Sequence, residues 1–478
     1  MNMITRLTTL SDKTVQWLWI ICILLISLLG GMVIGFFGNN LFLALLAGLA
    51  GLVLLLISAS NERFALYLLV ASTPLGEFLR VGTISSTLLI IPGGLAVFGL
   101  LVSLVLRRHQ LRIHFPIFIP ALLLGLWTTI SSYYNGGSLT EARPYWLVIV
   151  LAFLVPALLR SQRDLLRLCW VLVLSLGAAG LYVFLDRIIL YIGSNGNTNA
   201  NVLHNSALEI GGKDTIGLML SLALPVAFYL LDYYRSQPWK RMWLFVGGAT
   251  ALAGALATLS VGTFIGLCAF IVLTIWMQDK VMNRIRYIVL GAVILVMALA
   301  SPLAERLQTA TSVSMNDASW GTWRMTVWES SLRVFSEHPF WGLGPDQERV
   351  GEAVIAYVDP TLQASLFNHN NFSIVPHNFL LSIAVENGVL GLLLYLAMLF
   401  TCFYILWSSI RKLKNNQDAF FLYIFGKILF IGLAIVLVQA MGLSAHLDKS
   451  IWLLFGCVGA YGFVVRDALN PAQGQQGS

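Results

Sequence analysis

A histidine, an asparagine and a glutamate lie at the start of one of the most apolar stretches of the chain, PHNFLLSIAVENGVLGLLLYL at residues 376–396. Ionisable groups at the mouth of an apolar helix are costly unless they have a function, so this stretch is a candidate site. The imidazole of His377 titrates near neutral pH and could take a proton from a reacting hydroxyl. The alternative is that His377 only precedes an ordinary helix, with Pro376 and Asn378 suited to starting and capping it.

The spacing of small residues predicts what lies below this histidine. On a helix that turns about 100° per residue, Gly388 and Gly391 fall within about 40° of the direction of His377. This predicts a smooth groove under the imidazole, which a neighbouring helix or an isoprenoid chain could fill. Glu386 is expected to point to the opposite face, away from His377. The positive N-terminal end of the helix favours an anion beside the histidine.

A second element, SWGTWRMTVWESSLRVF at residues 319–335, places an arginine among tryptophans. Trp320, Arg324 and Trp328 recur at intervals of four, so a helix would set the guanidinium between two indole rings. The planar guanidinium of Arg324 could hold phosphate oxygens bidentately, beside aromatic rings on which sugars stack. The alternative is an interfacial helix whose tryptophans lie at the level of the lipid headgroups.

Further polar residues mark the starts of other apolar runs. Lys213 would supply a second cation for a diphosphate, unless it pairs with Asp214 or extends to the membrane interface. Arg143, directly before Pro144, is a third candidate cation. A short polar cluster near the C-terminal end comprises His446, Asp448 and Lys449.

The composition indicates the element that must position these groups. Of 478 residues 58% are hydrophobic and only 11% are charged, against about 25% charged residues in soluble chains. Apolar runs of roughly 17 or more residues, long enough to cross a membrane as helices, recur almost to the C-terminus. They are too long, and alternate too little, to be strands of a membrane barrel. We therefore predict an all-α, polytopic membrane bundle of about 12–14 transmembrane helices, with 242–277 either one bent segment or a hairpin.

The positions of the basic residues predict the topology. Most of the 29 Lys and Arg lie in alternate loops, which the positive-inside rule assigns to the cytoplasm together with both termini. The net charge of +7 then reflects topology rather than nucleic-acid binding. We predict N-terminal transmembrane helices, a large periplasmic loop containing helices, C-terminal transmembrane helices and a disordered tail at 1–303, 304–376, 377–466 and 467–478. All the candidate residues named above map to the periplasmic side.

Several kinds of site find no support in the sequence. The five cysteines lie in apolar runs without a CxxC pair, so neither a disulfide framework nor a zinc site is expected. No set of histidines and carboxylates has the spacing of metal ligands, and no Walker or Rossmann glycine loop occurs. We therefore expect no metal and no cofactor.

Together these elements resemble the superfamily of membrane glycosyltransferases that contains O-antigen ligases and O-antigen polymerases. The family signature is His-Asn, nine residues and Gly-x-x-Gly, which residues 377–391 match in full. Upstream, Arg324 and Trp328 match an Arg-x-x-x-Trp pattern, and residues 339–345 match Pro-x-x-Gly-x-Gly-Pro. Lys213 is similar to the lysine of a Lys-Asn pattern, with Asp214 in place of the asparagine. One departure is Val261, which stands where many members have the arginine of Ser-Arg-Gly.

The resemblance implies an activity and a set of roles. Such enzymes move a glycan from an undecaprenyl-diphosphate carrier to an acceptor hydroxyl at the periplasmic face of the bacterial inner membrane. The diphosphate is itself an activated leaving group, so no nucleotide or ATP would be needed. The reaction would be metal-independent, because the sequence offers no set of metal ligands, and it would be inverting if the displacement takes a single step. Arg324 and His377 would be catalytic, one holding the diphosphate and the other deprotonating the acceptor. The residues expected to bind substrate are Lys213, Arg143, Asn378, Trp328, Trp320 and Glu386.

The sequence is compatible with more than one acceptor. The His-Asn signature favours an O-antigen ligase in lipopolysaccharide biosynthesis, with lipid A-core as the glycolipid acceptor. A polymerase would take a second lipid-linked glycan as acceptor. A transporter of small anions such as bicarbonate is the alternative that is not an enzyme, although transporters usually place ionisable residues near the midplane of the bilayer. Here Lys427 is the main charged residue inside a predicted span.

Overall fold

Helices form all the regular secondary structure in the part of the chain that the structure describes, as predicted. The computed structural model describes residues 41–78, 84–106, 115–193, 212–278, 281–299, 320–358, 360 and 375–470. The helices are α3 (Leu41–Ser60), α4 (Glu62–Phe78), α5 (Ile84–Val105), α6 (Phe115–Tyr134), α7 (Leu139–Leu158), α8 (Gln162–Gly193), α11 (Lys213–Tyr233), α12 (Pro238–Ala257), α13 (Val261–Trp276), α14 (Val281–Leu299), α16 (Trp320–Glu337), α17 (Gln347–Ala356), α19 (Phe379–Leu413), α20 (Phe420–Ala440) and α21 (Lys449–Leu469).

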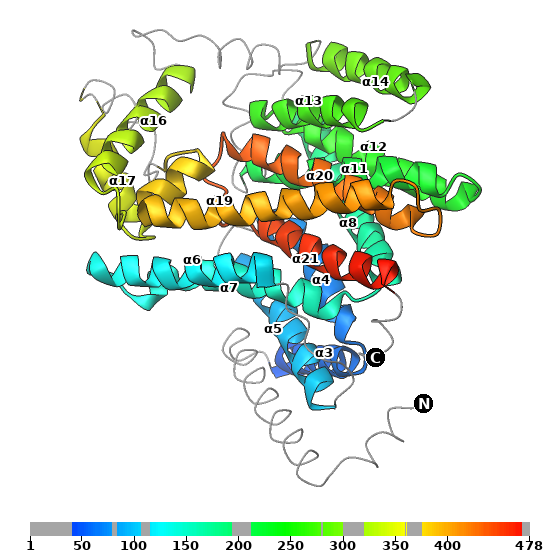
Figure 1. Cartoon of the computed structure of the whole chain (residues 1–478), viewed down its shortest axis with the longest axis horizontal. Helices are drawn as coiled ribbons and strands as arrows, with labels where there is room; N and C mark the ends of the chain where they lie inside the picture. Colours follow the sequence, from blue (N-terminus) through cyan, green and yellow to red (C-terminus); the bar gives the residue numbers. More distant parts are fainter. Residues whose placement is uncertain are drawn as a thin grey trace.

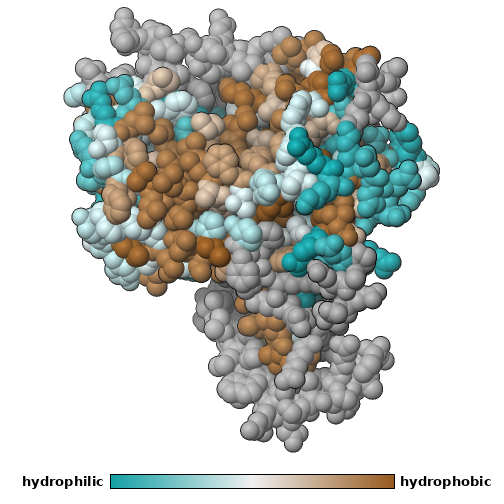
Figure 2. Space-filling model, viewed as in Figure 1, coloured by the Kyte–Doolittle hydropathy of each residue, from teal (hydrophilic) through white to brown (hydrophobic). Residues whose placement is uncertain are grey.

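Seven of the described helices are long and apolar enough to cross a membrane: α6, α7, α8, α11, α19, α20 and α21. Shorter apolar helices lie at Gly51–Ser60, Ile91–Val105, Val261–Trp276 and Tyr287–Val296. Several long helices run across the molecule in a similar direction, with α16 and α17 at one end (Figure 1). On the face shown in Figure 2, a hydrophobic band separates two hydrophilic ends, as expected for a membrane protein. The predicted count of 12–14 crossings stays a prediction, since residues 1–40 lie outside the described part.

The region 242–277 forms two separate helices rather than one bent segment. Helix α12 ends at Ala257 and α13 begins at Val261. The side chain of Ser260 caps α13 by accepting a hydrogen bond from the backbone N–H of Thr263 at 3.1 Å. This cap starts a new helix at the residue where the family arginine is replaced by Val261.

The centre of the bundle is built from α11, α20 and α21, whose side chains are largely enclosed. Its largest buried side chains include Trp452, Tyr395 and Phe455. The buried Lys427 of α20 donates from Nζ to the carbonyl oxygen of Met277 at 2.8 Å, just beyond the end of α13. A cation at the carboxyl end of a helix compensates unpaired carbonyls and the helix dipole, so Lys427 has a structural explanation.

A small second core lies outside the long bundle, between α16, α17 and the start of α19. Its buried members are Val327, Val334, Leu343, Val350, Val354 and Val385. Of the predicted loop at 304–376, residues 304–319, 359 and 361–374 lie outside the described part, and its boundaries stay predictions. The predicted tail begins too early, because α21 continues to Leu469 and the N–H of Asn470 still bonds to the carbonyl of Arg466.

Candidate functional site

Arg324 and His377 are both held by the short turn that joins α20 to α21. Arg324 Nη1 donates to the carbonyl oxygen of Gly442 at 2.5 Å. The backbone N–H of His377 donates to Ser444 Oγ at 2.9 Å. The structure therefore brings together the two residues predicted to be catalytic, although Arg324 lies on α16 and His377 precedes α19. Neither Gly442 nor Ser444 was singled out from the sequence.

The two side chains share one electrostatic environment. Arg324 is only 9% exposed, and burial lowers the pKa of its guanidinium to about 10, while the carboxylate of Asp214 opposes the shift. Burial and the positive charge of Arg324 lower the pKa of the His377 imidazole to about 4, again opposed by Asp214. At neutral pH the site therefore pairs a charged guanidinium with a neutral imidazole that can accept a proton.

The backbone fixes His377 in an unusual conformation. Its φ of +48° is left-handed, a region that costs an L-residue roughly 1–2 kcal/mol. The next residue, Asn378, caps α19: its side-chain oxygen accepts from the N–H groups of Leu380 and Leu381 at 3.0 and 3.3 Å. The capping role predicted for Asn378 is confirmed, and its contact with substrate stays a prediction.

Helix α19 is broken at Gly388, so the predicted groove below His377 is wrong. Gly388 has φ +65° and ψ −167°, a combination essentially restricted to glycine. His377 precedes the helix, and the helical rotation between His377 and Gly391 is interrupted. The prediction assumed an unbroken helix, whereas the chain changes direction at Gly388.

The turn at residues 339–344 packs into this break. Together with Trp127 it forms hydrogen bonds with the backbone groups of α19 that the break leaves unpaired. Backbone groups at a helix break need new partners when they are buried. Four hydrogen bonds supply them: Leu343 N–H to Val385 O at 2.8 Å, Gly344 N–H to Glu386 O at 2.9 Å, Trp127 Nε1–H to Asn387 O at 2.7 Å and Val389 N–H to Pro339 O at 2.7 Å. The Pro-x-x-Gly-x-Gly-Pro pattern thus joins the loop helices to the membrane helix that follows His377.

Aromatic rings secure the same turn against α6. Trp341 stacks on Trp127 and on Tyr134, with ring centroids 4.7 Å apart in each pair. The hydroxyl of Ser131 donates to the carbonyl oxygen of Trp341 at 2.7 Å. No sequence pattern indicates these contacts, because α6 and the turn are far apart in the chain.

Glu386 lies in a buried polar cluster next to the break. The hydroxyl of Tyr145 donates to Glu386 Oε2 at 2.7 Å, and His446 Nε2 lies 3.1 Å from the same oxygen. Asn387 Nδ2 donates to Tyr145 at 2.7 Å. His446 was visible as part of a polar cluster in the sequence, whereas nothing distinguished Tyr145 within its apolar helix. The assignment of Glu386 to substrate binding stays a prediction.

The remaining predicted residues differ in their surroundings. Trp328 lies one turn after Arg324 on α16, and its indole N–H is enclosed without a hydrogen-bond partner among the described residues. The side chain of Trp320 lies outside the described part. Arg143 is exposed on α7, and within the described ranges no hydrogen bond or ion pair joins it to Arg324 or His377. Lys213 is the first residue of α11, next to Asp214.

Comparison with known families identifies the segment that carries this site. Residues 246–396 match the family model described as O-antigen ligase. Arg324, His377 and Glu386 lie inside the matched segment, whereas Lys213 and the turn at Gly442 and Ser444 lie outside it. Comparison with curated proteins finds no significant match. Over residues 246–396, this chain is therefore similar to the family of O-antigen ligases.

Proposed function

We propose that the protein transfers a glycan from undecaprenyl diphosphate to an acceptor hydroxyl, with lipid A-core as the acceptor. The family match over residues 246–396 supports ligase- or polymerase-type activity in general, and the particular donor and acceptor are the proposal. The observation that carries it is the pairing of a charged, buried guanidinium with a neutral imidazole at one turn. This arrangement offers both an anion-binding group and a base in one place.

Arg324 is proposed to hold the diphosphate. A guanidinium that stays charged in a site shielded from water binds phosphate oxygens more strongly than an exposed one. As the bond from the anomeric carbon to the diphosphate oxygen breaks, its electron pair leaves with the diphosphate. The positive charge of Arg324 stabilises this developing charge, a type of interaction that commonly contributes about 10²–10³ in rate.

Lys213 is proposed to supply the cation missing at Val261. The starts of α11 and α13 are packed together, since a Cβ on Gly217, one turn after Lys213, would collide with Thr263. Thr263 is two residues after Val261. Asp214, next to Lys213, is close enough to influence the pKa values of Arg324 and His377. Lys213 thus fits this role better than Arg143, which is exposed on α7.

His377 is proposed to act as the general base. Its neutral imidazole takes the proton of the acceptor hydroxyl while the oxygen attacks the anomeric carbon opposite the departing diphosphate. A single displacement of this kind inverts the configuration at that carbon. Binding of the diphosphate would place negative charge near the imidazole and raise its pKa toward the range of a useful base.

The positive-inside pattern supports a periplasmic site. A polymerase would use the same donor and the same two residues, so the acceptor distinguishes the two activities. Lys427, the main charged residue inside a predicted span, donates to a carbonyl at the end of α13, and this structural role weighs against the transporter alternative.

The test is a transfer assay with purified protein and undecaprenyl-diphosphate glycan, offering lipid A-core and a second lipid-linked glycan as acceptors. His377→Gln and Arg324→Ala should each lower the rate by about 10²-fold or more. Matched controls are His338→Gln and Arg333→Ala, which change exposed residues of the same region. Near-normal transfer by both site variants, at normal expression, would overturn the proposal, and elongation without transfer to lipid A-core would assign the polymerase activity.

A further inference from the structure

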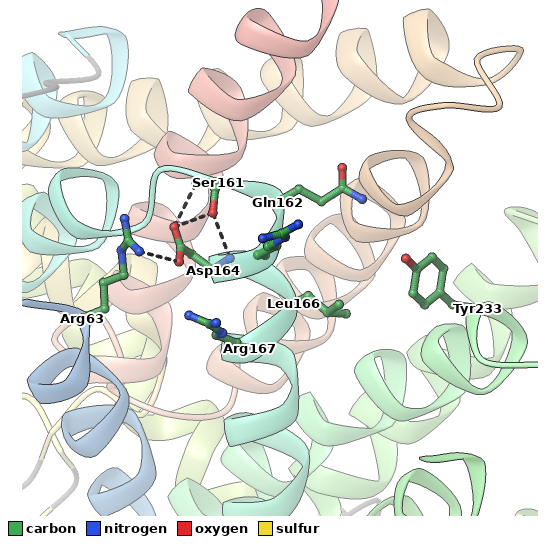
Figure 3. Close-up of a pocket in the computed structure, with 8 residues that line it drawn as sticks. Arg63, Ser161, Gln162, Asp164, Leu166, Arg167 and Tyr233 are labelled. Atoms are coloured by element: carbon green, nitrogen blue, oxygen red, sulfur yellow. Dashed lines mark hydrogen bonds and ion pairs between the residues drawn. The ribbon is translucent and has the colours of Figure 1, made fainter. Parts of the chain in front are cut away.

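A second basic site lies at the opposite end of the helices from His377. A cavity of about 840 Å³ opens there between α4, α8 and α11. Its lining includes Arg63, Arg163, Arg167, Asp164 and Tyr233. Figure 3 shows Arg63 and Ser161 around the carboxylate of Asp164, with Tyr233 across the cavity. Three arginines and one carboxylate give this cavity a net positive charge.

Arg63 and Asp164 neutralise each other and form a fixed wall. Arg63 Nη1 lies 3.2 Å from Asp164 Oδ1, and the carboxylate is almost fully buried. Its other oxygen accepts from the hydroxyl and the N–H of Ser161 at 2.7 and 3.0 Å. Arg63 Nε also donates to the carbonyl oxygen of Leu158 at 3.3 Å. These contacts compensate the charge of the carboxylate and the charge of one of the three arginines.

Arg163 and Arg167 remain as uncompensated charges. They are four residues apart on α8, which places them on the same face of the helix. Both side chains are exposed, and neither has an ion-pair partner within the described part of the chain. Arg167 stands one turn beyond Asp164 and makes none of the marked contacts in Figure 3. Two guanidinium groups are thus available to an anion.

The position of the cavity at the ends of membrane helices indicates the kind of anion. Arg167 directly precedes the long apolar stretch of α8, and Tyr233 is the last residue of α11. Arginine and tyrosine at the ends of membrane helices lie at the level of the lipid headgroups. Guanidinium groups bind phosphate oxygens through paired hydrogen bonds. An anionic lipid would present its phosphate at this level.

We propose that this cavity binds a phosphate-bearing anion through Arg163 and Arg167, with the Arg63–Asp164 pair as its rigid wall. The position at the edge of the apolar band favours the headgroup of an anionic phospholipid over a soluble phosphate. The site does not depend on the proposed glycosyl transfer, since Tyr233 of its lining is at the opposite end of α11 from Lys213.

The experiment measures retention of phosphatidylglycerol by the purified full-length protein, using native mass spectrometry with phosphatidylcholine as the neutral reference. The double variant Arg163→Ala/Arg167→Ala should bind phosphatidylglycerol at least about ten-fold more weakly. The matched control, Arg241→Ala/Lys412→Ala, removes two exposed charges that do not line the cavity and should stay within about two-fold.

A titration with inorganic phosphate separates the two sources of the anion. Competition that depends on Arg163 and Arg167 would assign the site to a soluble phosphate, and its absence would assign it to a lipid headgroup. Equal binding by both double variants would overturn the proposal, because general surface charge would then explain the retention. The thermal unfolding midpoint should not change, since both arginine side chains are exposed and without ion-pair partners among the described residues.

Discussion

The break in α19 makes Gly388 a sensitive structural position near the site. We expect Gly388→Ala to destabilise the protein, because its φ of +65° and ψ of −167° are strained for any residue with a Cβ. That strain amounts to about 1–3 kcal/mol. In addition, the new Cβ would collide with the carbonyl of Phe340 in the inserted turn.

Relief of the collision requires the turn at 339–344 to withdraw. Withdrawal breaks the hydrogen bonds from Val389 to Pro339 and from Leu343 to Val385. Each buried group left without a partner costs about 1–3 kcal/mol. The expected loss is therefore about 1–3 kcal/mol from strain alone, and roughly 3–9 kcal/mol if the turn withdraws and one buried group of each bond loses its partner. Transfer activity should fall as well, since this turn connects the helix of Arg324 to the helix that follows His377.

The assay compares the apparent unfolding midpoint in detergent and the hydrogen exchange of the α16 and α17 amides. Gly432→Ala is the matched control, because its Cβ would lie 3.5 Å from Leu222 Cδ2, an ordinary contact within a membrane helix. The control should change stability by about 1 kcal/mol or less. An unfolding midpoint and an exchange pattern for Gly388→Ala equal to those of the control would refute the reasoning.

Three further predictions concern the residues around the site. The pKa of His377 is lowered to about 4, so kcat/KM should stay level from pH 7 to about pH 5 and fall only as the imidazole becomes protonated. A pH profile in which kcat/KM falls to half its maximum near pH 6.5 would contradict this. Glu386→Ala should lower the free energy of unfolding by about 2–5 kcal/mol, because it leaves the buried Tyr145 hydroxyl and His446 Nε2 without their shared partner. The loss should exceed that of Tyr145→Phe, and unfolding of both variants in detergent would compare the two. Trp328→Phe keeps an aromatic ring but removes the enclosed indole N–H, so KM for the donor glycan should rise by up to about ten-fold at unchanged thermal stability; an unchanged KM would show that this N–H does not contact substrate.

Local features of the sequence were enough to predict several elements of the protein. The low charge and long apolar runs indicated an all-α membrane bundle, since a helix satisfies its own backbone inside lipid. Arg324 and Trp328 lie on one helix, α16, as their four-residue spacing predicted, and Asn378 caps α19 as expected. These features depend on contacts within a few residues, which the order of residue types controls directly.

Contacts between distant segments decided the rest. The Asn387-Gly388 dipeptide is prone to turns, yet the break is stable only because residues 339–344 and Trp127 supply its hydrogen bonds. The cluster of Glu386, Tyr145 and His446 joins three segments that no periodicity relates. The lowered pKa of His377 comes first from burial and then from Arg324, and only the folded chain creates both. Residue types therefore indicated which side chains could take part in the chemistry. Tertiary packing determined which of these groups are charged, which are paired and which face each other.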